Sequence, residues 1–102
     1  MKTFIDAKDL PTLAQHHHLK NLDFANADVK ELAAAVPGTT FLWVVEPCET
    51  TLHNLRQKPS WISRALSNPQ AVVYEITVRP HAELQIDQIS RDGARVLLAT
   101  AA

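Results

Sequence analysis

Five consecutive apolar residues, Phe41 to Val45, lie between two turn signals in this chain of 102 residues. Pro37-Gly38 precedes them and Pro47 follows them. The stretch Thr39 to Glu46 is rich in β-branched and aromatic residues, which favours a strand over a helix. Because successive side chains of a strand point to opposite faces of its sheet, a run without a polar residue predicts a strand buried on both faces, near the centre of the sheet.

Helical patterns precede this strand. Ala27 to Val36 consists mostly of good helix formers with its acids near the start, and Pro37-Gly38 would end the helix sharply. Further upstream, Asp9 is a suitable N-cap for a helix from Leu10 to Lys20. A very short strand, Leu22 to Phe24, is expected between the two helices.

After the strand, the pattern predicts more helix and then more strand. Thr50 or Thr51 could cap a short helical turn through Leu52 and Leu55. Ser60 caps a predicted helix from Trp61 to Ser67, which Asn68-Pro69 ends.

The last third of the sequence has β character. Ala71 to Val78 predicts a strand. Asp92-Gly93 lies between the runs Leu84 to Ile89 and Ala94 to Ala99, and this dipeptide favours a type I′ hairpin. Leu84 and Ile86 are two residues apart and would point to the same face of a strand, whereas Ile89 would point to the other face. We therefore expect a β-bulge near Asp87-Gln88.

These elements predict a single globular domain over residues 1–102, supported by a hydrophobic content of 46%. The expected fold class is α+β. It would have two layers, with three or so short helices packed on one face of a mostly antiparallel sheet that ends in a C-terminal β meander.

Charge and composition argue against several functional classes. The formal net charge is −1, so the molecule lacks the strong positive field of a nucleic-acid or anionic-membrane binder. The single cysteine, Cys48, cannot form an internal disulfide. The N-terminal residues lack the apolar core of a signal peptide, and no apolar run approaches the roughly 20 residues of a membrane helix. We therefore expect a cytoplasmic protein that does not bind membranes.

His16-His17-His18 is the most conspicuous motif, but its spacing is wrong for a metal site. Neighbouring residues of a helix point about 100° apart, whereas zinc-binding histidine pairs on a helix lie four residues apart. We therefore expect no metal at this position. The sequence also contains no P-loop, GxGxxG, HExxH, GxSxG or CxxC motif, so no cofactor is expected.

A second group of reactive residues follows the apolar strand. Cys48 and His53 could form a thiolate–imidazole pair or provide two metal ligands. Because no second cysteine supports either role, a structural cysteine is the favoured interpretation. Cys48 and His53 remain the weak catalytic candidates.

A third group lies in the stretch Thr50 to Tyr74, which contains no acidic residue. The ligand-binding candidates there are Arg56, Lys58, Trp61 and Arg64, which could bind an anion or stack on a planar ligand. The alternative is a solvated basic helix face with Trp61 in the core. Trp43, within the apolar strand, is expected to be a core residue.

No assembled catalytic pattern is present, so the favoured hypothesis is a small non-catalytic binding or interaction module. It would act as a homo-oligomer or as an adaptor to another macromolecule. A dimer is expected because an apolar strand from Ala94 to Ala99 would expose a sheet edge. The alternatives are a small-ligand or anion-binding protein that uses the Trp61 and Arg64 region, and a small enzyme that uses Cys48 and His53. The sequence leaves the ligand, the partner and the biological process open.

Overall fold

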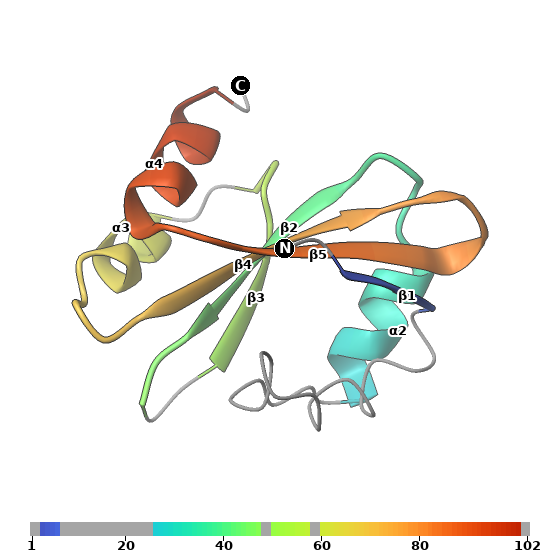
Figure 1. Cartoon of the computed structure of the whole chain (residues 1–102), viewed down its shortest axis with the longest axis horizontal. Coiled ribbons are helices and arrows are strands. Elements are labelled where there is room, and N and C mark those ends of the chain that lie inside the picture. The colour runs from blue at the N-terminus through green and yellow to red at the C-terminus, as the bar shows by residue number, and fades with distance from the viewer. Residues whose placement is uncertain (1–2, 7–25, 48–49, 58–59, 101–102) are drawn as a thin grey trace.

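A five-stranded sheet organises the molecule (Figure 1). The computed structural model describes residues 3–6, 26–47, 50–57 and 60–100. Neighbouring strands are antiparallel throughout, in the order β1-β5-β4-β2-β3. The strands are β1 (Thr3–Asp6), β2 (Thr40–Val45), β3 (Thr50–Asn54), β4 (Val72–Val78) and β5 (Glu83–Ile89). The predicted α+β class with a mostly antiparallel sheet is confirmed.

The helices within the described ranges are α2 (Asn26–Ala34), α3 (Ser60–Leu66) and α4 (Arg91–Thr100). A 3-10 turn, η3 (Pro80–Ala82), joins β4 to β5. The helix predicted before Pro37-Gly38 and the one predicted after Ser60 are therefore confirmed. The helix expected over residues 10–20, with its three histidines, and the short strand over residues 22–24 lie outside the described residues.

The apolar run that begins at Phe41 forms β2, and all of its residues to Val45 are buried. Alternation along the strand sends Phe41, Trp43 and Val45 to one face of the sheet and Leu42 and Val44 to the other. Burial on both faces is therefore confirmed. The central position in the sheet belongs to β4, with β2 beside it.

Each face of the sheet has its own core and its own helical cover. One cluster joins Leu32 of α2 to Phe41, Trp43, Val45, Tyr74, Ile76, Val78, Leu84 and Ile86. The other joins α3 and α4 to the opposite face, through Leu42, Val44, Leu55, Ile62, Ala65, Leu66, Ala71, Val73 and Ala94. Figure 1 shows α2 on one side and α3 with α4 on the other. The helices do not share one face, because β2 is apolar at both parities and each of its faces requires cover.

The predicted strand from Ala94 to Ala99 is wrong, because these residues belong to helix α4. The Asp92-Gly93 hairpin and the third strand of the meander are therefore also wrong. Ser90 precedes the helix, and its Oγ accepts a hydrogen bond from the Gly93 N–H at 2.9 Å, which is an N-cap. The described glycine with a positive φ is Gly38, at 94°, and not Gly93.

Pairing with a neighbouring strand explains why two further local predictions are wrong. The helical turn predicted through Leu52 and Leu55 is wrong, because β3 pairs along β2 from Val45↔Thr50 to Phe41↔Asn54. The bulge expected near Asp87-Gln88 is also wrong, because β4 and β5 pair in continuous register through Tyr74↔Gln88 and Glu75↔Asp87.

Candidate functional site

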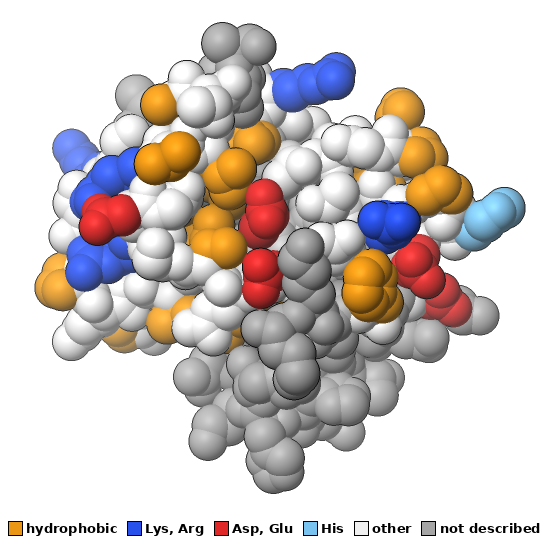
Figure 2. All heavy atoms as spheres, turned by 45° about the horizontal axis from the view of Figure 1, so that its top comes forward, with side chains coloured by type: hydrophobic (Ala, Val, Ile, Leu, Met, Phe, Trp, Pro, Cys, Tyr) orange, Lys and Arg blue, Asp and Glu red, His pale blue; other side chains and the backbone are white. Residues whose placement is uncertain are grey.

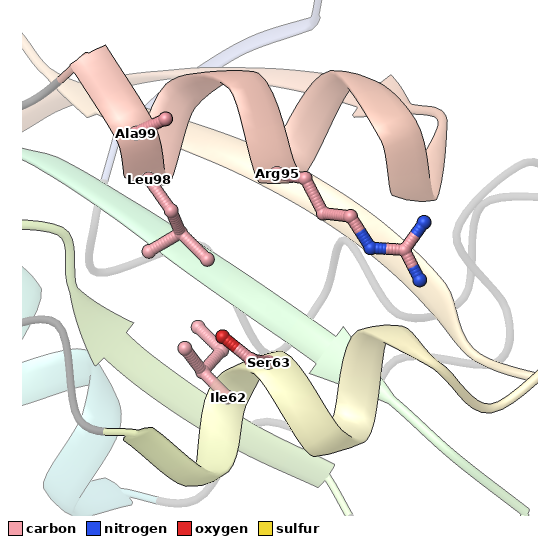
Figure 3. A pocket seen from close by; sticks show the side chains of 5 residues that line it. All are labelled: Ile62, Ser63, Arg95, Leu98 and Ala99. Carbon is pink, nitrogen blue, oxygen red and sulfur yellow. The ribbon is translucent and has the colours of Figure 1, made fainter.

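Helices α3 and α4 lie on the same face of the sheet and enclose a hollow between them (Figure 3). The hollow has a volume of about 310 Å³ and is lined by Ile62, Ser63, Arg95, Leu98 and Ala99. In Figure 3 the side chains of Ile62 and Leu98 point toward one another, and the Ser63 hydroxyl lies beside Ile62. The hollow thus has both apolar and polar lining residues.

The guanidinium of Arg95 lies at one end of the hollow and is held in place by two hydrogen bonds. Its Nη1 donates to Asp92 Oδ1 at 2.7 Å, and its Nη2 donates to the Leu66 carbonyl oxygen at 3.0 Å. These bonds use two of the five N–H donors of a guanidinium. Because 46% of the side chain remains exposed, the charge is both oriented by the fold and accessible to solvent.

Two further apolar side chains of α4 lie outside the lining of the hollow. Val96 is 61% exposed, while Leu97 and Leu98 are partly buried against the core beneath them. Figure 2 shows hydrophobic side chains beside Lys and Arg side chains on this part of the surface. Val96 and Arg95 are adjacent in the sequence, and both side chains reach the surface of α4.

A second hollow lies at the N-terminal end of α4 and shares Arg95 with the first. Its volume is about 350 Å³, and its lining residues are Ala71, Val72, Gln88, Ile89, Ser90, Arg91, Asp92 and Arg95. The surface is thus indented on both sides of Arg95. Asp92, the ion-pair partner of Arg95, also lines this second hollow.

His53, a catalytic candidate, is buried in β3 opposite Leu42 of β2. Burial lowers the pKa of His53 from its ordinary value, because the charged imidazolium is poorly solvated there. Cys48 lies outside the described residues, so the pairing of Cys48 with His53 stays a prediction.

The ligand-binding candidates are only partly described. Arg56 follows β3 and Arg64 lies in the last turn of α3, and both are exposed. Lys58 lies outside the described residues, as does the side chain of Trp61, whose backbone belongs to α3. Trp43 is fully buried in the core, as predicted.

Arg95 and Leu98, which line the hollow from α4, are not among the residues predicted from the sequence to form a site. Ala94, Leu97 and Leu98 have the i, i+3, i+4 spacing of one helical face, and Ser90 lies just before this pattern, at the position of an N-cap. This combination was the signal that could have revealed the site.

Further features of the described residues bear on the type of site. They include no group of three or more His, Cys, Asp or Glu side chains placed to hold a metal ion. In the same part of the chain, no helix has the length and apolar character needed to cross a membrane. No protein-family model matches the chain, and comparisons with curated proteins and with solved structures also give no match.

Proposed function

We propose that this chain is a non-catalytic interaction module that binds another protein through the surface formed by α3 and α4. This α3–α4 surface consists of Ile62, Ser63, Arg64, Arg95, Val96, Leu98 and Ala99. The observation that carries the proposal is the hollow between α3 and α4, lined by Ile62 and Leu98, with the oriented Arg95 guanidinium at its end.

The size and lining of the hollow favour a protein side chain as its occupant. Pockets for drug-sized ligands range from about 300 to 1,000 Å³, so the volume of about 310 Å³ is at the lower limit. Protein interfaces place a buried apolar anchor in a small pocket and surround it with polar contacts. Leu98 and Ala99 would contact such an anchor, and exposed Val96 would extend the apolar contact.

Charge indicates the chemistry of the partner. Among the described residues, α3 and α4 carry three cations, Arg64, Arg91 and Arg95, and one acid, Asp92. Asp92 is already paired with Arg95, so the surface is positive. A partner segment with an apolar side chain flanked by Asp or Glu would complement it, since complementary charge steers association and selects partners.

Selection from a displayed library of random peptides tests this proposal. The wild-type chain should enrich peptides in which an apolar residue is flanked by acids. Val96→Glu should weaken binding of the enriched peptides by roughly tenfold or more, because it places an acid in the apolar contact. The matched control is Val36→Glu, at a 73% exposed valine that follows α2, and it should bind as the wild type does.

Two outcomes would contradict the proposal. If the enriched peptides contain no acidic residues, the arginines do not select the partner. Equal binding by the Val96→Glu and Val36→Glu variants would move the site away from α4.

A further inference from the structure

The backbone of β3 presents hydrogen-bonding groups on the side away from β2. The Leu55 N–H donates to the Thr40 carbonyl at 2.9 Å, which extends the β2–β3 register by one pair. Because bonded and non-bonded pairs alternate in an antiparallel ladder, His53 and Thr51 also direct their backbone groups to β2. Leu52, between them, therefore directs its N–H and C=O to the outer side of the sheet.

β2 provides independent support for this alternation. The Val78 N–H donates to the Thr39 carbonyl at 2.8 Å, so Thr39, just before β2, directs its C=O toward β4. Odd-numbered residues of β2 thus direct their backbone N–H and C=O groups toward β4, and even-numbered residues direct theirs toward β3. Leu42 and Val44 are the β2 partners of His53 and Thr51, as the alternation along β3 requires.

The two outer strands differ in how they are protected against pairing with another chain. β1 has four residues, ends on the exposed Asp6 and carries Phe4 beneath the Arg79 guanidinium, 5.8 Å from the ring centre. A short strand with a charge is a common way to block an edge. β3 (TTLHN) contains no Lys, Arg, Asp, Glu or Pro. Within the described part of the chain, β3 is the last strand on its side of the sheet.

A second copy of β3 fits this edge. In an antiparallel pair about a two-fold axis at Leu52, the two Leu52 residues would exchange both of their backbone hydrogen bonds. Thr50 of each copy would lie opposite Asn54 of the other. A charged residue near the axis would face its own equivalent or a close neighbour, and β3 has no Lys, Arg, Asp or Glu to cause that repulsion.

We infer that two copies of this chain pair through β3, antiparallel about a two-fold axis at Leu52, and join their sheets into one continuous sheet. The inference uses the β3 edge and not the α3–α4 surface, so it stands or fails separately from the proposed function.

Amide hydrogen exchange, combined with sedimentation equilibrium, tests the inference on the wild-type chain. The His53 amide, which faces β2, should exchange slowly at every concentration and is the internal reference. The Leu52 amide should be protected only where the sedimenting mass is twice the 11.3 kDa of one chain. A dimer in which Leu52 exchanges freely, a chain that stays monomeric at high micromolar concentration, or a monomer with Leu52 protected would each overturn the inference.

Asn54→Pro provides a second test, because it replaces an outward-facing N–H with a ring and leaves the bonds of His53 and Thr51 to β2 intact. The variant should sediment as a monomer with an unchanged far-UV circular dichroism spectrum. The matched variant Asn54→Ser keeps the N–H and should remain a dimer. A folded Asn54→Pro variant that is still dimeric would contradict pairing at β3. If Asn54→Pro does not fold, the wild-type Leu52 exchange decides.

Discussion

The guanidinium of Arg95 in α4 donates a hydrogen bond from Nη2 to the carbonyl oxygen of Leu66, the last residue of α3, at 3.0 Å. The final carbonyl groups of a helix have no partner within that helix. Arg95 satisfies one of them and also places a positive charge at the negative end of the helix dipole. The contact therefore fixes the end of α3 against the start of α4, beside the hollow that both helices line.

Replacing Arg95 with Met should lower the free energy of unfolding by about 1 kcal/mol, because the Leu66 carbonyl loses its charged donor while the apolar stem is retained. The loss should be small for a charged hydrogen bond, since Arg95 is half exposed. Asp92→Asn is the control and should change stability by less than about 0.5 kcal/mol, because its ion pair with Arg95 is at the surface. Urea denaturation measures both values, and equal losses would assign the effect to the ion pair.

Ser90→Ala should lower the free energy of unfolding by about 1 kcal/mol, because it removes the oxygen that accepts the Gly93 N–H at the start of α4. Ser67→Ala is a suitable control, since the Ser67 hydroxyl only donates to the Ser63 carbonyl on an exposed surface. Thermal melting of both variants provides the comparison. If Ser90→Ala is as stable as the wild type, the start of α4 does not depend on this cap.

Gly38→Ala should destabilise the protein by about 1 kcal/mol or more, because Gly38 has a φ of 94°, where a Cβ is strained. No atom lies within 4 Å of the position of that Cβ, so the cost is in the backbone and not in packing. Gly38→Asn should cost less, because Asn tolerates positive φ better than Ala. Denaturant midpoints of the two variants should therefore differ, and the opposite order would refute this explanation.

Stability should decrease as the pH falls below 6.5, because burial lowers the pKa of His53 in the folded chain from its value of 6.5. At a pH between the pKa of His53 in the folded chain and its pKa in the unfolded chain, the unfolded chain binds more protons. Lowering the pH therefore favours unfolding. Urea titrations from pH 7 to about pH 5 should show a shallower decrease for His53→Leu than for the wild type. Equal slopes for the two proteins would exclude His53 as the cause.

The candidate site was harder to predict than the core. The sequence predicted Cys48, His53 and the cations between Thr50 and Tyr74 as candidate site residues. The hollow instead combines Ile62 and Ser63 of α3 with residues from the last helix. Arg95 is 29 residues from Leu66, and only the packing of α4 beside α3 brings the two together.

The ends and burial of several elements were determined by the local sequence. Pro37-Gly38 follows α2 because proline cannot continue a helix and Gly38 takes a positive φ. The apolar run from Phe41 to Val45 could only be buried on both faces, because every position in it is apolar.

Tertiary structure decided those segments whose local pattern suits more than one conformation. Ala94 to Ala99 is a short run that is apolar except for Arg95, and such a run fits a strand or a helix until the Ser90 cap and the contacts with the core select the helix. Thr50 to Asn54 became a strand because β2 offered an unpaired ladder of backbone groups, and buried backbone groups require partners. Strand pairing and helix packing join residues far apart in the chain, so no local pattern could specify which face or edge each segment would occupy.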